Sequence, residues 1–114
     1  MPVVNYNDIS RSDVKMDGVS LTTKASVIGP DEGWSDNAMR VFRIAPGGNT
    51  PSHQHDWEHV NHVISGKGTL TIGDETFELK EKDFAFVPPN TMHQYRNPND
   101  EDFEFICIVP KRGA

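Results

Sequence analysis

The sequence has a single cysteine and no long hydrophobic segment. Cys107 has no second cysteine in the chain with which to form a disulfide, which fits a reducing compartment. No apolar run approaches the roughly 20 residues that a membrane-spanning helix needs. The first residues, 1–6, have neither the basic nor the hydrophobic part of a signal peptide. We therefore expect a cytoplasmic protein that does not associate with a membrane.

Positive charge is scarce and dispersed. The chain has 11 Lys and Arg against 17 Asp and Glu, a formal net charge of −6, and its basic residues form no stripe. This charge argues against a nucleic-acid partner, and acidic patches such as residues 100–102 are expected to be solvated surface. At 114 residues the chain is one domain, small enough that a partner subunit would help to bury its surface.

Sustained helical periodicity is also missing. Seven short segments are instead rich in β-branched and aromatic residues: 20–28, 38–44, 59–64, 69–72, 76–79, 84–87 and 103–109. Residues suited to turns, mainly Gly, Pro, Asn and Asp, separate them. Short strands at near-regular spacing predict an all-β sandwich or barrel.

Histidine is rare, yet four of the five histidines lie within residues 53–62. His53, His55 and His59 share odd parity within residues 51–63, and positions of one parity face the same side of a β-strand. His62 has the opposite parity and is expected to point away, unless a bulge near residues 56–57 shifts the register.

The fifth histidine, His93, follows the turn at residues 88–90, and closure of the fold would have to bring it to the three that share odd parity. A lone histidine is more often a surface or hydrogen-bonded residue than a ligand. A set of imidazoles, however, suits divalent transition metals. Four converging histidines would form a metal centre.

The residues around these histidines resemble the two conserved motifs of the cupin superfamily. The stretch from Gly47 to His55, followed by His59 and Gly66, resembles the first motif, and residues 88–97 resemble the second. Together they cover about residues 40–100. Within the superfamily the chain resembles the small single-domain, four-histidine manganese cupins, in which a Phe-x-Cys-x-x-Pro pattern like that of residues 105–110 also occurs.

This resemblance implies a double-stranded β-helix, or jelly-roll, small barrel. Residues 1–114 would form a single cupin domain, with an N-terminal arm at about 1–19 and a metal-binding barrel at about 20–110. It also implies a homodimer, in which residues 2–6 could exchange or pair across a two-fold axis. One divalent metal ion per chain is expected, preferably manganese, with iron, nickel, copper and zinc as other candidates, held by His53, His55, His59 and His93.

Three residues depart from the cupin pattern. His59 stands where most cupins have a glutamate ligand, so the site would have four histidines and no carboxylate. Asn90 replaces a glycine, a mild change because Asn tolerates the left-handed conformation. Lys82 replaces the glycine that usually precedes the residue at Asp83, which makes that turn less certain.

Four neutral imidazoles leave the charge of a divalent ion uncancelled, so the site should attract anionic guests. If the four ligands lie on one side of an octahedral ion, two adjacent positions stay open, as an enzyme requires. If they close a tetrahedron, the site is structural.

Strand parity predicts the other residues of a cavity beside the metal. Arg40 shares a face with Phe42, and is either an anion anchor or one end of a salt bridge. Phe105 and Cys107 share a face of the last strand, which by resemblance looks toward the metal. Cys107 is either a modulator of the metal site or a small buried residue.

Three more residues are candidates for the cavity. Asn61 has the parity of His59 and could orient a metal-bound water or substrate, and Tyr95 could offer a hydroxyl. Trp57 either walls the mouth of the pocket or packs at a subunit boundary.

These features favour a metal-dependent oxygenase of the dioxygenase type acting on a small organic substrate, with Arg40, Tyr95 and Cys107 as candidate catalytic residues. Phe42, Asn61, Trp57 and Phe105 would line the substrate pocket. Two alternatives stay open: a non-redox isomerase, lyase or decarboxylase, and a small-molecule binding or sensing module. The scarcity of general bases in the proposed cavity weakens the former, and the lack of an appended signalling domain weakens the latter.

Overall fold

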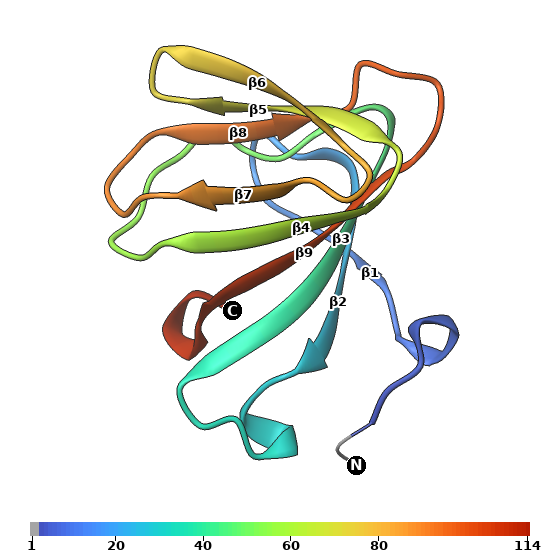
Figure 1. Ribbon diagram of the computed structural model, residues 1–114, viewed down its shortest axis with the longest axis vertical. Coiled ribbons are helices and arrows are strands. Elements are labelled where there is room, and N and C mark those ends of the chain that lie inside the picture. The colour runs from blue at the N-terminus through green and yellow to red at the C-terminus, as the bar shows by residue number, and fades with distance from the viewer. Residues whose placement is uncertain (1–2) are drawn as a thin grey trace.

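The computed structural model describes residues 3–114 as a curled antiparallel sheet with almost no helix (Figure 1). Its strands are β1 (Ser12–Asp13), β2 (Ser20–Ile28), β3 (Asn37–Asn49), β4 (His59–Ser65), β5 (Lys67–Ile72), β6 (Glu75–Lys80), β7 (Phe84–Val87), β8 (His93–Arg96) and β9 (Phe103–Pro110). Three short 3-10 helices complete it: η1 (Tyr6–Asp8), η2 (Pro30–Glu32) and η3 (Lys111–Gly113). Each of the seven predicted strands is present.

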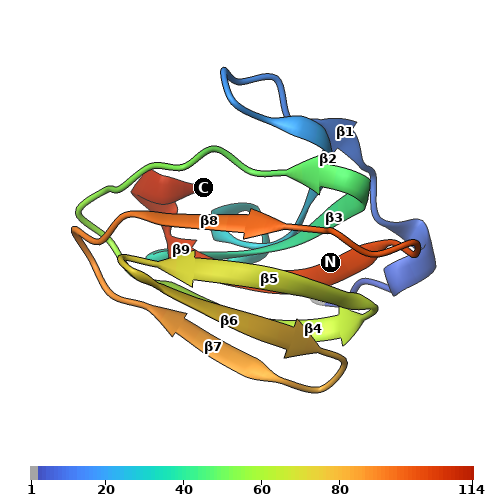
Figure 2. The same cartoon turned by 90° about the horizontal axis from the view of Figure 1, so that it is seen from above.

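The sheet runs in the order β6-β5-β8-β3-β9-β4-β7, with β2 paired to β3 and to β1. The long strand β3 joins the two halves: residues 37–44 pair with β9, and Asn49 pairs with Arg96 of β8. Because β3 passes from one half to the other, the sheet curls around a shared interior, which is visible from above in Figure 2. This is the jelly-roll barrel that the sequence predicted.

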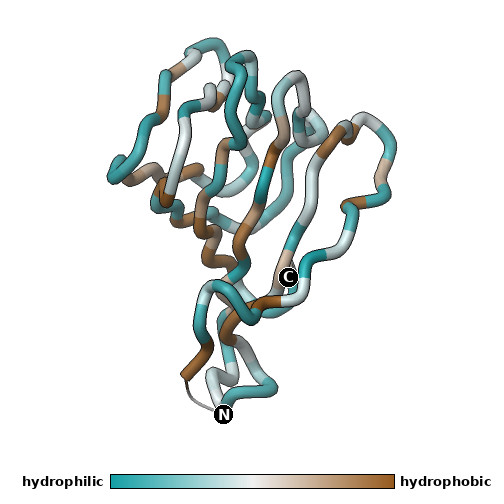
Figure 3. The backbone as a smooth tube through the Cα atoms, turned by 90° about the vertical axis from the view of Figure 1, so that its right-hand side faces the viewer, coloured by the Kyte–Doolittle hydropathy of each residue, from teal (hydrophilic) through white to brown (hydrophobic). Residues whose placement is uncertain are grey.

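Alternation along the strands builds the core of this barrel. Phe103, Phe105 and Cys107 point inward from β9 and are at most 1% exposed, and they pack with Ile44 and Leu70 from other strands. Hydrophobic residues lie along the strands, whereas the surrounding loops are largely hydrophilic (Figure 3). Burying each large side chain stabilises the fold by about 1.5–3 kcal/mol. The predicted inward face of the last strand is therefore correct.

The N-terminal arm folds back on the barrel of its own chain. Strand β1 pairs with β2, the Tyr6 hydroxyl donates a hydrogen bond to Glu104, and Arg11 forms an ion pair with the same carboxylate at 3.3 Å. The segment expected to pair across a two-fold axis is residues 2–6. Its first residue, Pro2, lies outside the described residues, and that pairing stays a prediction.

Two of the departures from the cupin pattern adopt the left-handed backbone conformation. Asn90 has a φ of 59° and Lys82 a φ of 77°. At Lys82 the turn forms without glycine, because the side chain of Asp83 accepts a hydrogen bond from the Lys80 backbone at 2.9 Å and pairs with its ammonium at 3.5 Å. Within residues 3–114, no helix has both the length and the apolar character needed to cross a membrane.

Candidate metal centre

His53 and His55 lie on a loop and not on a strand. The parity argument treated residues 51–63 as one extended segment, but strand β4 begins only at His59. Pro51 has no N–H to donate to a ladder, and the chain bends at residues 56 and 57. The grouping of the histidines must therefore have another cause.

Backbone hydrogen bonds to the segment before and within β8 hold this loop. His53 and His93 exchange both of their backbone bonds, at 3.2 and 2.9 Å. The His55 carbonyl accepts from Asn90 at 2.7 Å, and the Tyr95 carbonyl accepts from Thr50 at 2.9 Å. Fold closure thus brings His93 beside the loop that carries His53 and His55.

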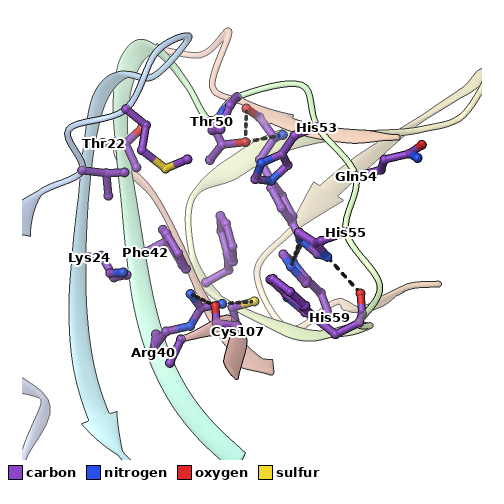
Figure 4. A pocket seen from close by; sticks show the side chains of 18 residues that line it. Thr22, Lys24, Arg40, Phe42, Thr50, His53, Gln54, His55, His59 and Cys107 are labelled. Atoms are coloured by element: carbon purple, nitrogen blue, oxygen red, sulfur yellow. Dashed lines mark hydrogen bonds between the residues drawn. The ribbon is translucent and has the colours of Figure 1, made fainter. Parts of the chain in front are cut away.

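The four imidazoles form one cluster at the end of a cavity. One nitrogen from each of His53, His55 and His93 lies within 4.8 Å of the others, an arrangement that can hold a metal ion. The ring of His59 lies 4.8 Å from that of His93 between centroids, and its Nε2 is 3.0 Å from the Nε2 of His55. Figure 4 shows His53, His55 and His59 on the same side of the cavity. His62 packs against Phe84 instead, as its parity predicts.

The second nitrogen of two of these rings is occupied by a backbone carbonyl. Nδ1 of His93 lies 2.9 Å from the Thr91 oxygen, and Nδ1 of His55 lies 3.0 Å from the Trp57 oxygen. A carbonyl only accepts, so each Nδ1 carries the proton and each Nε2 keeps a lone pair for the cluster. Nε2 of His93 is buried and has no hydrogen-bond partner among the described residues. A metal ion fits this donor set.

His59 is oriented by a buried side-chain network. Its Nδ1 lies 3.3 Å from the hydroxyl of Tyr95, and that hydroxyl donates to Oδ1 of Asn61 at 2.6 Å. Because the hydroxyl proton goes to Asn61, Nδ1 of His59 donates to the phenol oxygen and Nε2 faces the cluster with a lone pair. Asn61 is only 1% exposed and is not among the residues that line the cavity. Asn61 therefore supports Tyr95 from the side away from the cavity. The expectation that Asn61 lines the cavity was wrong.

The four histidines of the cluster are held in the neutral form. Burial, followed by the charges of His93 and His55, lowers the pKa of His59 to about 2. Burial is also the largest cause of the lowered pKa of His53, His55 and His93. Neutral imidazole is the form that binds a metal, so the cluster needs little proton release before it can coordinate an ion.

His55 and His59 are close enough to bind the same ion. Two nitrogens on an ion with bonds of about 2.1 Å are about 3.0 to 3.4 Å apart, and the Nε2 atoms of His55 and His59 are 3.0 Å apart.

A cavity of about 360 Å³ lies beside the cluster. The predicted residues Arg40, Phe42, Trp57, Tyr95, Phe105 and Cys107 all line it, with His53, His55 and His59. Sequence reasoning missed Lys24 from β2, and Val14 and Met16 from the N-terminal arm. The place of Lys24 follows from the register of β2 against β3, in which it pairs with Phe42, because cross-strand partners share a face.

Arg40 is buried in this cavity without a carboxylate. It is 5% exposed, donates to the Cys107 sulfur at 3.3 Å and to the Gly113 carbonyl at 3.4 Å, and lies over the ring of Phe42 at 5.0 Å. None of the ion pairs within residues 3–114 involves it. Of the two readings of Arg40, the salt bridge is therefore excluded for the described residues. Burial raises the pKa of Cys107, so its sulfur is a neutral thiol.

Trp57 forms part of the cavity wall next to His55. Its ring stacks on that of His55 at 4.2 Å with an interplanar angle of 7°, and Arg112 lies over it at 5.7 Å. Helix η3 packs so closely that a Cβ on Gly113 would lie 2.4 Å from the indole nitrogen. The C-terminal turn thus fixes Trp57 and, through it, His55.

Comparison with known proteins places this architecture in a family. A model of the cupin domain matches residues 40–109. The chain is 28% identical over 122 residues to auxin-binding protein 1 of Arabidopsis thaliana, covering 97% of this chain and 60% of that protein. It is 34% identical over 68 residues to 1-hydroxy-2-naphthoate 1,2-dioxygenase of Nocardioides sp., covering 60% of this chain and 17% of that protein.

Both relatives are longer than the chain, which spans less than two thirds of either. Among solved structures, the polyketide cyclase RemF from Streptomyces resistomycificus superposes with a TM-score of 0.90 at 27% identity, over 96% of this chain and 79% of that one. The fold is thus shared with RemF over almost the whole chain, while the relatives are named for different activities.

Proposed function

Because this chain belongs to the cupin domain family, we propose that it is a metal-dependent enzyme of the dioxygenase type that acts on a small organic substrate. The convergence of the imidazoles carries this proposal: Nε2 of His55, His59 and His93 keeps a lone pair because Nδ1 of each ring is engaged elsewhere. The open cavity beside them leaves room for a substrate.

We propose His59 as the fourth ligand, beside the three histidines whose nitrogens lie within 4.8 Å. One divalent ion per chain would supply Lewis acidity and, in the case of manganese or iron, redox chemistry. Manganese is our first choice because the chain resembles the four-histidine manganese cupins. Iron, nickel, copper and zinc are the other candidates.

The residues of the chain then bind and enclose the substrate. Phe42 and Phe105 stack at 5.5 Å and provide an apolar surface that keeps water out. The Cys107 thiol and Arg40 lie together in the cavity wall. Arg40 lies across the cavity from His55 and His59, and the Cys107 sulfur lies between Arg40 and His59 (Figure 4). Their role is to contact the substrate while it lies beside the ion.

The same cavity offers few groups for the non-redox alternative. An isomerase or lyase that works through an enolate needs a group to take up a proton. Among the described residues no Asp or Glu lines the cavity, so Lys24, whose pKa is lowered by burial and by Arg40, is the candidate base outside the histidine cluster. Tyr95 does not take this role, because burial raises its pKa well above its ordinary value and its proton is held by Asn61. Both a dioxygenase and an isomerase occur among the relatives.

Metal analysis of the protein purified without added metal tests this proposal. We expect close to one transition-metal ion per chain, less than a tenth of that in the His53→Ala/His93→Ala variant, and a clear loss in His59→Ala. His62→Ala is the matched control, since His62 packs against Phe84 outside the cluster. Equal metal in wild type and double variant, or none in either after reconstitution with manganese, would overturn it. A metal-loaded protein that consumes no O2 with any organic acid would favour the isomerase, lyase or decarboxylase reading, or the binding module.

We also propose a homodimer, formed through the outer face of β7, β4 and β9. The register places Phe84 beside His62, Phe86 beside Val60, and Ile106 and Ile108 next to them on the same face. Phe84 and Phe86 are 78% and 56% exposed. Since none of these side chains carries a fixed charge, the face is suited to a second copy of itself across a two-fold axis.

A further inference from the structure

We propose that the cavity binds the carboxylate of a flat, largely apolar organic acid through Arg40 and Lys24, with the body of the acid lying between them and the histidines. This inference rests on the proposed function, because it names the chemical class of the substrate. It is carried by the charges of the cavity wall, by the missing partner of Arg40, and by the aromatic surface between the two ends.

The charged side chains of the cavity wall are all positive. Lys24 and Arg40 line it together with the histidines, Tyr95 and Cys107, and no Asp or Glu is among the lining residues. This contrasts with the whole chain, in which acidic residues outnumber basic ones by 17 to 11. Two cations in one small cavity repel each other, and an anion between them would relieve the repulsion.

Arg40 has unused donors. A guanidinium offers five N–H groups, and within residues 3–114 Arg40 donates only to the Cys107 sulfur and to the Gly113 carbonyl. Its Nε is buried and has no partner among the described residues. Three of the other four arginines form ion pairs: Arg11 and Arg43 both reach Glu104, and Arg112 reaches Asp56. The fourth, Arg96, is exposed to solvent. A buried cation without an anion is costly to keep, so a role in binding explains it better than a role in stability.

Lys24 supplies the second charge from the neighbouring strand. It is paired with Phe42 in the register of β2 and β3, two residues along β3 from Arg40, and its side chain is half-buried. Burial and the charge of Arg40 both lower its pKa. None of the ion pairs within the described part of the chain includes Lys24 either. Figure 4 shows Lys24 and Arg40 on the β2–β3 side of the cavity, across from His55 and His59.

Stacked aromatic rings connect the two ends of the cavity. Phe42 stacks on Phe105 at 5.5 Å and Phe105 on Tyr95 at 4.5 Å, while the ring of Tyr95 lies 6.3 Å from that of His59. Arg40 lies over the outer ring, Phe42. A planar molecule that lies along these rings with its carboxylate at Arg40 points its other end at the histidine cluster. This geometry selects a carboxylic acid with an unsaturated or aromatic body.

Calorimetric titration with benzoate and its neutral analogue benzamide tests the proposal on protein loaded with manganese and on protein stripped with EDTA. We expect benzoate to bind at least about tenfold more tightly than benzamide, since hydrogen bonds to a charged group are the strong ones. Arg40→Met should weaken benzoate binding by about tenfold to a hundredfold and leave benzamide binding unchanged. Arg40→Lys keeps the charge and loses the planar guanidinium, so its affinity for benzoate should lie between those of wild type and Arg40→Met. Lys24→Met should lower the affinity for benzoate less than Arg40→Met does.

Arg96→Met is the charge-matched control, because Arg96 is an exposed residue of β8 on the outside of the barrel. It should leave benzoate affinity unchanged. Equal affinity for benzoate and benzamide in wild type, or equal loss of benzoate binding in the Arg40 and Arg96 variants, would overturn the proposal. Tighter binding of inorganic phosphate than of benzoate would also overturn it, in favour of a phosphate site.

The metal state separates this inference from the proposed function. If metal binds but benzoate and benzamide bind with equal affinity, the proposed carboxylate site at Arg40 is wrong and the metal centre stands. If no metal binds but benzoate still requires Arg40 in the stripped protein, the acid-binding cavity stands and the enzyme proposal fails. Thermal unfolding of Arg40→Met should occur at the same or a higher temperature than that of wild type, and a lower one would indicate that Arg40 serves stability.

Discussion

At the scale of single residues, the metal centre depends on what holds the far nitrogen of each imidazole. His55 and His93 use backbone carbonyls, whereas His59 uses the hydroxyl of Tyr95, which depends in turn on Asn61. A carbonyl is fixed by the fold and cannot be deleted by substitution. The Tyr95 hydroxyl can be deleted, so it offers a direct test of ligand orientation.

We expect Tyr95→Phe to lower metal affinity about tenfold to a hundredfold, the usual effect of losing the partner of a ligating histidine. The change also leaves Oδ1 of the buried Asn61 without its donor, which should cost about 1–3 kcal/mol in the free energy of unfolding. Competition with a chelating dye measures the affinity, and urea unfolding measures the stability.

Tyr6→Phe removes the same atom from the only other tyrosine and is the control. Its hydroxyl binds Glu104 on the outside of the barrel, so stability should fall while metal affinity stays at the wild-type value. Wild-type affinity in Tyr95→Phe would show that His59 does not depend on this network.

The lowered pKa values of the histidines predict how the metal-free protein responds to acid. In the unfolded chain an imidazole has a pKa of about 6.5, whereas in the folded protein the pKa of His59 is about 2 and those of the other three ligands are also lowered. Above about pH 6.5 both states are neutral, and these groups do not make stability depend on pH. Below it the unfolded chain takes up protons that the folded protein cannot.

We therefore expect the free energy of unfolding of EDTA-treated protein to decrease as the pH falls below about 6.5. His59 alone should contribute about 1.4 kcal/mol per pH unit. Urea unfolding at pH 7.5, 6.5 and 5.5 measures this slope, and His59→Gln should make it shallower between pH 6.5 and 5.5. An unchanged free energy at pH 5.5 would mean that the folded histidines titrate normally.

At the scale of elements, the part of the site that lies on a loop is braced by its neighbours. The loop at residues 50–58 is held by β8 on one side, and helix η3 presses on Trp57 from the other. We expect Gly113→Ala to displace the indole ring from its stack on His55, because the added Cβ would lie 2.4 Å from the indole nitrogen. Overpacking of this kind costs about 1–3 kcal/mol.

The displacement should shift tryptophan fluorescence and weaken metal binding severalfold. Gly33→Ala is unsuitable as a control because its φ is positive, but Ser35→Ala places a change beside the other tryptophan, Trp34, without crowding. It should leave both readouts unaltered. If Gly113→Ala binds metal as wild type does, η3 does not brace the ligand loop.

The elements also show what the sequence could and could not reveal. Alternation of hydrophobic and polar residues predicted strands such as β2 and β7 with their observed bounds, and it predicted the inward face of β9. It could do so because a sheet that is buried on one side has a hydrophobic residue at every second position. The same argument was wrong for the loop carrying His53 and His55, where tertiary hydrogen bonds set the side-chain directions. Strand β8, four residues long with two polar outward side chains, gave too weak a pattern to detect.

The candidate site followed the same division. The histidines were identifiable from the sequence because they stand at the motif positions even though the segment that carries His53 and His55 is a loop. Arg40 and Phe42 were identifiable as neighbours in the cavity because they lie on one face of a regular strand. Asn61 was misplaced, since parity gives a direction but not a depth, and Tyr95 lies between it and the cavity. Lys24 and the arm residues Val14 and Met16 could not be found without the register of β2 against β3 and the path of the arm.

At the scale of the whole molecule, the outer face of β7, β4 and β9 is the feature that a single barrel leaves unexplained. A stable interface buries about 800 Å² on each partner, a small part of the 6813 Å² surface of this chain. Phe84 and Phe86 on the short edge strand β7 would form its centre, where aromatic side chains contribute most to association. We expect sedimentation equilibrium to give twice the chain mass of 12.8 kDa.

The double variant Phe84→Glu/Phe86→Glu should shift this equilibrium to the monomer, because two copies would bring like charges together across the two-fold axis. Leu21→Glu is the control: Leu21 is 61% exposed on β2, outside the proposed interface, and its replacement should leave the dimer intact. Since the cavity of one chain is lined by that chain's own residues, the monomeric variant should keep its metal. A wild-type protein that sediments as a monomer would refute the dimer, and loss of metal on dissociation would show that the partner supports the site.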